Sequence, residues 1–123
     1  ERLRITSAGR VTVKKSSNSE FATTIVTSGS AIALDFDDAD NFNVTLSAPA
    51  ALSNPTNITV GQSGCIVMEQ DGGSSDISSW GSYWHFEGGT EPNLSTADDA
   101  IDNLCYFVAS ATSIHAVLLK DMK

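Results

Sequence analysis

The sequence is divided into short apolar and β-branched runs, with Gly, Pro, Asn and Ser between them. After residue 20 these runs are 21–27, 31–36, 42–46, 57–60, 64–69, 80–86, 104–109 and 114–119. Apolar residues alternate with small or polar ones in Phe42–Leu46, as expected for a strand with one buried face. Short runs at a spacing of about 8 to 12 residues predict an all-β fold, specifically an antiparallel β-sandwich or jelly-roll-like domain.

Composition agrees with this fold class. The chain has 123 residues, enough for one domain, and 28 of them are Ser or Thr, which suit pleated strands and turns. Hydrophobic residues make up 41% of the chain, with a mean hydropathy of -0.06. No apolar run approaches the roughly 18 residues of a membrane span, so we expect no membrane insertion. One stretch, Ser95–Asp102, predicts a single helical turn.

The first 20 residues differ from the rest. Leu3–Thr6 and Val11–Val13 flank a Gly-containing connection, which predicts a β-hairpin, and 14–20 contains no apolar residue, which predicts a linker. We therefore expect a ribbon and linker at 1–20 and a β-body at 21–123. The chain begins with Glu1 and not Met, so we expect a fragment or a processed product.

Charge is unevenly distributed along the chain. The net charge is -8, the cations lie in the first 15 and the last four residues, and residues 16–119 contain no Lys or Arg. So acidic a body repels phosphate backbones and anionic lipid headgroups, which argues against nucleic-acid binding. On the ribbon, the basic residues are expected to keep the strands soluble.

Two cysteines, Cys65 and Cys105, lie inside apolar runs. Free Cys is among the residue types most often buried, so the sequence predicts two core thiols, no disulfide and assembly in a reducing cytosol.

No motif predicts catalysis or a cofactor. The acidic run Asp35–Asn41 lacks the Gly and Glu positions of a calcium loop and is interpreted as a hairpin tip, so no metal is expected. His85 and His115 are interpreted as strand histidines. The chain is therefore expected not to be an enzyme. The alternative is a glycan-active enzyme, which would need two carboxylates facing each other across an aromatic cleft.

The aromatic block Trp80–Phe86 is the most informative motif. Strict alternation would place Trp80, Trp84 and Phe86 on one face of a strand. Such aromatics either stack on sugar rings or fill a core or a subunit interface. The candidate contact residues for a glycan, a receptor or a neighbouring subunit are Trp80, Tyr83, Trp84 and His85.

Two stretches resemble bacteriophage virion proteins. The opening Glu1–Val11 resembles a segment that recurs in phage fibre and appendage proteins, although it continues as Thr12-Val13-Lys14 and not Gly-Ile-Gly. The region Ile32–Met122 resembles a C-terminal domain of phage structural proteins, especially those of marine and cyanobacterial phages. Its marks are Asn43–Leu46, Asn54–Asn57, Gly61–Gly64, Glu69–Gly72, Trp80–Phe86, Gly88–Thr96 and Asp102–Tyr106. The family usually has Lys where His85 stands and often Thr where Glu69 stands.

The resemblance implies a virion component, the distal domain of a trimeric tail or capsid fibre that contacts the host surface, with 1–20 at the end of the fibre shaft. The expected partners are two further copies of the chain and other virion proteins, with assembly in the bacterial cytoplasm, and the aromatic block adds a host-surface glycan as a candidate. A two-stranded ribbon cannot bury its own apolar residues, so the expected trimer interface comprises Leu3, Ile5, Val11 and Val13. The further alternative is a ligand-free decoration or adaptor domain, which burial of Trp80 and Trp84 within one subunit would favour.

Overall fold

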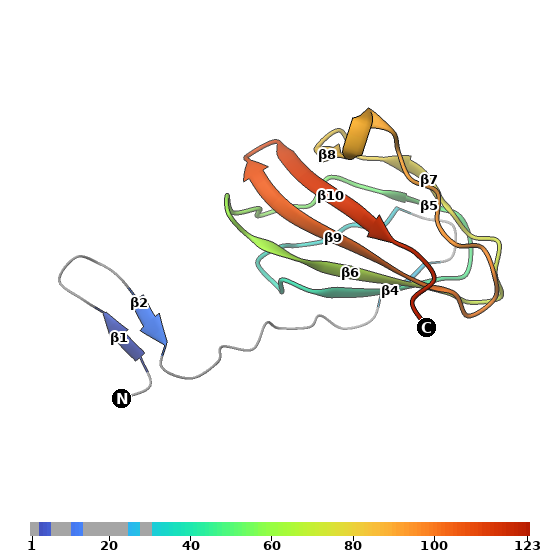
Figure 1. Ribbon diagram of the computed structural model, residues 1–123, viewed down its shortest axis with the longest axis horizontal. Coiled ribbons are helices and arrows are strands. Elements are labelled where there is room, and N and C mark those ends of the chain that lie inside the picture. The colour runs from blue at the N-terminus through green and yellow to red at the C-terminus, as the bar shows by residue number, and fades with distance from the viewer. Residues whose placement is uncertain (1–2, 6–10, 14–24, 28–30) are drawn as a thin grey trace.

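The computed structural model describes residues 3–5, 11–13, 25–27 and 31–123 (Figure 1). Its strands are β1 (Leu3–Ile5), β2 (Val11–Val13), β3 (Ile25–Thr27), β4 (Phe42–Leu46), β5 (Ala50–Leu52), β6 (Ser63–Gln70), β7 (Ile77–Trp80), β8 (Trp84–His85), β9 (Ile101–Ser110) and β10 (Ser113–Leu119). A short 3-10 helix, η1 (Glu87–Gly89), is the one helical element of the described residues. The predicted all-β fold is confirmed.

The strands form three sheets. β1 pairs with β2 in antiparallel fashion, Leu3 opposite Val13 and Ile5 opposite Val11, as the hairpin prediction required. The large sheet has the order β3-β4-β6-β9-β10-β8, and β5 pairs with β7 in a small second sheet. The boundary expected between residues 20 and 21 lies outside the described residues.

The large sheet is mixed and not purely antiparallel as expected. β4 and β6 are parallel neighbours in one layer, and β5 and β7 are parallel neighbours in the other. This pairing arises because the chain crosses from the large sheet to the small one after β4, returns at β6, and crosses again to β7. The chain re-enters each layer at the same end every time. Successive strands of one layer are therefore parallel.

The same pattern extends one turn further towards the N-terminus. β3 is parallel to β4, and parallel bridges join Ile32 to Leu52 and Asp35 to Thr56. The body therefore begins with three turns of a coil, in which the chain alternates between the two layers. The antiparallel hairpin β9–β10 then adds to β6, and the two-residue β8 pairs in parallel with the start of β10.

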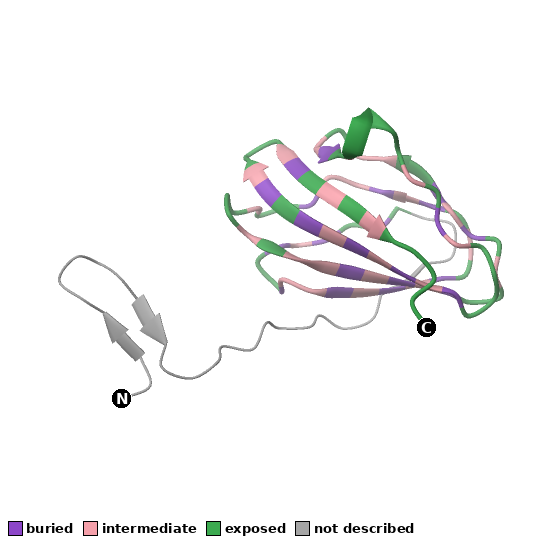
Figure 2. Cartoon of the chain, viewed as in Figure 1, coloured by how far each residue is buried: buried purple, intermediate pink, exposed green. Residues whose placement is uncertain are grey.

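The core lies between the two layers. Along β4, and along most of β6 and β9, buried residues alternate with more accessible ones, which is visible as purple bands in Figure 2. An aromatic cluster occupies its middle: Phe36 stacks on Phe42 and Tyr106 with ring centroids 5.5 and 4.7 Å apart, and Trp84 meets Tyr106 edge-on at 6.4 Å. Burying each such side chain stabilises the fold by about 1.5–3 kcal/mol.

Two buried polar side chains hold the loops beyond β6 and β9. The Gln70 amide donates to the carbonyls of Ser75 (2.6 Å) and Ser95 (2.9 Å) and accepts from the Ser75 N–H. The Asp102 carboxylate, 2% exposed, accepts from the N–H groups of Ser95 (2.6 Å) and Asp121 (2.7 Å). These bonds replace lost hydration and fix the 71–100 segment and the C-terminus to the sheet.

Several predicted elements differ from the structure. Residues 31–36 make isolated bridges and no continuous strand, and residues 57–60 form bends and turns. β5 lies between the expected runs 42–46 and 57–60, where no strand was predicted. The helical turn expected at Ser95–Asp102 is reduced to a single bond from the Ala100 N–H to the Ala97 carbonyl, because Ile101 already begins β9.

Candidate interaction surface

The side of the large sheet that faces away from the core presents a mostly apolar area with a single carboxylate. We call it the outer face. It comprises Cys65, Val67 and Glu69 of β6, Ile101, Asn103, Cys105 and Phe107 of β9, and His115, Val117 and Leu119 of β10. Phe107, Val117 and Leu119 are 50%, 51% and 45% exposed. Large apolar side chains half in solvent on adjacent strands form a patch of the kind that marks interaction sites.

The outer face avoids the charge carried by the rest of the body. Residues 31–119 contain no Lys or Arg, and their many carboxylates lie mainly in loops. Among the outer-face residues defined above, Glu69 is the single carboxylate. A strongly acidic protein has therefore kept one large surface nearly neutral.

A disulfide between Cys65 and Cys105 crosses the outer face, and the prediction of two free core thiols is wrong. The two residues are register partners on antiparallel β6 and β9 and are only partly buried. The error came from treating the whole of each apolar run as core. Alternation places the neighbouring Ile66 and Leu104 inward, and so turns both cysteines outward. The inference of a reducing compartment, which rested on free thiols, loses its support.

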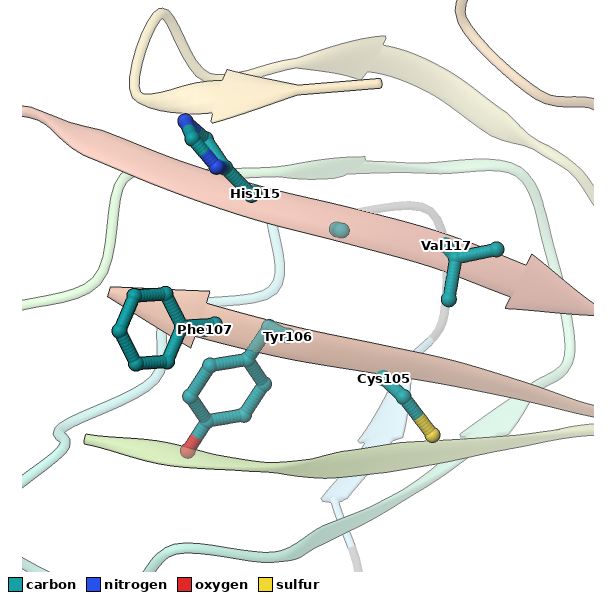
Figure 3. Close-up of a pocket in the computed structure, with 6 residues that line it drawn as sticks. Cys105, Tyr106, Phe107, His115 and Val117 are labelled. Atoms are coloured by element: carbon teal, nitrogen blue, oxygen red, sulfur yellow. The ribbon is translucent and has the colours of Figure 1, made fainter. Parts of the chain in front are cut away.

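Beside the disulfide lies a shallow hollow of about 380 Å³ (Figure 3). It is lined by Cys105, Tyr106, Phe107, His115, Ala116 and Val117. Phe107 and His115 are register partners on β9 and β10, as are Cys105 and Val117. The hollow is therefore a depression between two rows of side chains, with a mostly apolar lining suited to a protruding apolar side chain of another protein.

The outer face ends at a pair of histidines. His115 of β10 is the register partner of His85 of β8, both side chains are exposed, and their ring centroids are 6.4 Å apart in an edge-to-face arrangement. Sequence pattern alone could not place the two histidines together, because 29 residues separate them and the β8–β10 pairing is parallel.

The aromatic block is not one strand, which corrects the single face expected for its aromatics. β7 ends at Trp80, a turn follows, and β8 begins at Trp84. Trp84 is buried, and its indole N–H donates to the Ser53 carbonyl at 3.2 Å, so it is a core residue and not a surface contact. Trp80 and Tyr83 are partly buried against the core, whereas His85 is exposed.

A further hollow, of about 290 Å³, lies on the other side of β10. It is lined by Phe86, Glu87, Thr90, Glu91, Pro92, Ala116, Val117 and Leu118. Trp80 packs edge-on against Phe86, with ring centroids 4.7 Å apart, and so holds one wall of this hollow. The hollow combines an aromatic ring with hydrogen-bond acceptors, the combination that sugar binding uses.

The acidic run 35–41 is held by amide side chains. The Asn57 side-chain amide donates to both carboxylate oxygens of Asp35, at 2.9 and 3.0 Å, and the Asp37 N–H donates to one of them. These donors favour the charged form and hold the pKa of Asp35 below its ordinary value. The Gln62 amide donates to the Phe36 carbonyl and to the Asp40 carboxylate. Among the described residues, no group of three or more His, Cys, Asp or Glu side chains is arranged to hold a metal.

The expected trimer interface at Leu3, Ile5, Val11 and Val13 lies on β1 and β2, whose side chains are outside what the structure describes. Within the part of the chain that is described, no helix has the length and apolarity to cross a membrane. Comparison with family models, curated proteins and solved structures finds no match to this chain.

Proposed function

We propose that the chain is the distal domain of a bacteriophage tail or capsid fibre, a homotrimeric structural component of the virion that contacts the host surface. The resemblance of Glu1–Val11 and of Ile32–Met122 to phage fibre proteins supports the class of protein. The observation that carries the assembly is the outer face, an apolar and nearly uncharged surface on an otherwise acidic body.

The occupant we propose for the outer face is another copy of the chain. Identical acidic bodies repel each other over most of their surfaces, so copies can approach closely only where carboxylates are few. The outer face meets this condition, and its exposed Phe107, Val117 and Leu119 would lose water contact on association. Closed rotational symmetry would let three copies cover these faces.

The oligomeric state of the intact chain tests this proposal. Light scattering after size exclusion should report a trimer at micromolar concentration. Val117→Asp and Leu119→Asp should shift the population towards monomer, because each places a carboxylate where a neighbouring copy would lie. Val60→Asp is the matched control: Val60 is 62% exposed but lies outside the outer face, so this variant should remain trimeric. A monomeric intact chain, or equal effects of all three variants, would contradict the proposed interface.

We propose the hollow lined by Phe86, Glu87 and Glu91 as the contact for a host-surface glycan. Labelled host cells or an oligosaccharide array should bind the wild-type chain. Glu91→Gln with Phe86→Ala should remove binding, while Val60→Asp should keep it. Loss of binding in the control variant, or no change in the double variant, would contradict this assignment.

The same experiment separates a binding module from the glycan-active alternative. Chromatography of the bound oligosaccharide after overnight incubation should recover it intact if the chain is a structural and attachment module. Shortened products that disappear in Glu87→Gln or Glu91→Gln would instead establish an enzyme.

Antibodies raised against the chain should label fibre ends on intact particles in electron micrographs.

A further inference from the structure

We infer that His85 and His115 together form a binding site for a divalent transition-metal ion such as Zn²⁺ or Cu²⁺. The inference rests on the pairing of β8 with β10, which makes the two histidines direct neighbours across strands. The site needs one copy of the chain and no host partner. His115 also belongs to the outer face, so under the proposed fibre function the site lies at the edge of the interface between copies.

The backbone fixes the two side chains on one surface. Parallel pairing places His115 beside His85, and Ile114 beside Trp84, in the adjacent register position. Trp84 and Ile114 are buried, so alternation directs both histidines outward. Neighbouring strands are about 4.8 Å apart, a spacing at which two imidazoles can reach one ion.

The present separation of the rings needs only a small adjustment. Zn–N bonds of about 2.0–2.1 Å and tetrahedral angles place the centroids of two bound imidazoles roughly 5 Å apart. The centroids of His85 and His115 are 6.4 Å apart, with the rings at 87° to each other. Both side chains are exposed, and exposed rotamers change on a picosecond-to-nanosecond scale, so small rotations of the two rings can close this gap.

The surroundings leave room for the rest of the coordination shell. His85, Phe86, Glu87, His115 and Ala116 line a hollow of about 320 Å³. Glu87 borders this hollow without forming a three-residue cluster with the histidines among the described residues. The site would therefore supply two nitrogen ligands and leave the remaining positions to water, as in an open metal site.

Imidazole ligands select the type of ion. Neutral histidine suits Zn²⁺, Ni²⁺ and Cu²⁺, whereas Ca²⁺ and Mg²⁺ prefer oxygen ligands. The many carboxylates of the body can bind hard cations weakly elsewhere on its surface, and such binding does not involve the two histidines. Nitrogen ligands generally bind Cu²⁺ more tightly than Zn²⁺, so the histidine pair should have the higher affinity for Cu²⁺.

The test is calorimetric titration of the intact chain, without a histidine tag, using ZnCl₂ and CuSO₄ in a non-chelating buffer. We expect one saturable site per chain for each metal, with the tighter dissociation constant for Cu²⁺, and no corresponding signal with CaCl₂. His85→Gln and His115→Gln should each weaken Zn²⁺ binding by at least about tenfold, because losing an inner-sphere ligand costs no less than losing an outer-sphere partner.

Asp71→Asn is the matched control. Asp71 is exposed directly after β6 and lines none of the hollows described above, so removing its charge should leave the Zn²⁺ affinity unchanged. In the wild-type chain, Zn²⁺ should also shift the ring-proton resonances of both histidines together, a readout that requires no variant. Wild-type affinity in either histidine variant, or a Zn²⁺ response of only one histidine, would overturn the assignment.

Discussion

Cys65 and Cys105 are joined by a disulfide across β6 and β9, with Cα atoms 4.0 Å apart. β6 is the last strand that the parallel coil contributes to the large sheet, and β9 is the first strand of the antiparallel hairpin that follows it in that sheet. The bond therefore connects the two parts of the body at their junction. It also lies at the centre of the outer face, where its sulfur atoms contribute to the apolar surface.

The first prediction concerns this disulfide. Thiol titration of the unfolded, unreduced chain should find no free thiol. Replacing both residues in Cys65→Ser with Cys105→Ser should lower the free energy of unfolding by about 2–4 kcal/mol, because the bond closes a loop with a sequence separation of 40 residues. Denaturant titration measures this difference, and reduced wild-type protein is the control. Two titratable thiols in the unreduced chain would contradict the pairing.

Gly64 provides a second prediction. A Cβ atom at this position would overlap the carbonyl of Asp40. It would also lie 3.1 Å from the hydroxyl oxygen of Tyr106. Gly64→Ala must therefore displace either β6 or the acidic run, at a cost of about 1–3 kcal/mol for overpacking. Ser63→Ala, on the same strand but exposed, should change stability by less than about 0.5 kcal/mol. Equal stabilities of the two variants would show that the Asp40 carbonyl can move aside without a cost in stability.

The third prediction is a pH dependence at Tyr106. Its hydroxyl donates to the Asp40 carbonyl at 2.6 Å, and burial, together with the nearby Asp40 carboxylate, raises the pKa of Tyr106 well above its ordinary value. The folded chain thus keeps a proton that the unfolded chain releases. The resulting stabilisation is complete below about pH 10 and is lost as pH rises towards the folded-state pKa.

Tyr106→Phe tests this assignment. At pH 8 the variant should be less stable by about 1 kcal/mol, the net value of one hydrogen bond. Between pH 8 and pH 10.5 it should lose less stability than the wild-type chain, because its share of the proton linkage is absent. Guanidinium titrations at the two pH values measure both differences. An unchanged alkaline loss in the variant would assign the dependence to other groups.

Asp102 gives the fourth prediction. Its buried carboxylate accepts hydrogen bonds from the N–H groups of Ser95 and Asp121. Asp102→Ala therefore leaves both N–H groups without this acceptor. We expect a loss of at least about 3 kcal/mol, from two charge-assisted bonds of about 1.5–3 kcal/mol each. Asp102→Asn keeps one acceptor and should lose less. Amide hydrogen exchange should accelerate at Ser95 and Asp121, and equal behaviour of the two variants would contradict the role of the charge.

Local pattern predicted the strands whose apolar residues alternate clearly. The expected run 42–46 coincides with β4, and 64–69, 104–109 and 114–119 fall within β6, β9 and β10. In these segments one buried face decides the conformation, so period-two alternation carries the information. β5 was missed because Ala50–Leu52 is only three residues long and lies between two prolines.

The order of the strands could not be read from the same pattern. Parallel pairing of β4 with β6 joins residues such as Val44 and Met68 across a crossover through the other layer, and no residue type marks that path. Another long-range parallel pairing, of β8 with β10, makes His85 and His115 neighbours. The disulfide is different, since strict alternation from Ile66 and Leu104 would have turned both cysteines to one outward face.

The last prediction concerns the ribbon. β1 and β2 pair with Leu3 opposite Val13 and Ile5 opposite Val11, and a two-stranded ribbon is marginal by itself. If three copies associate, the ribbons can share their apolar residues, and the basic residues of 1–15 can meet carboxylates of neighbouring copies. Deleting residues 1–15 should therefore weaken the trimer several-fold without unfolding the body.

Sedimentation at several concentrations measures the trimer, and circular dichroism monitors the body. Arg4→Gln with Arg10→Gln, which keeps the apolar residues, should reproduce only the salt-sensitive part of the effect, because exposed ion pairs contribute little and are screened by salt. Val60→Asp again serves as the variant expected to behave as wild type. If the chain without residues 1–15 forms trimers as tightly as the intact chain, the ribbon has no part in assembly, and the outer face must hold the copies together alone.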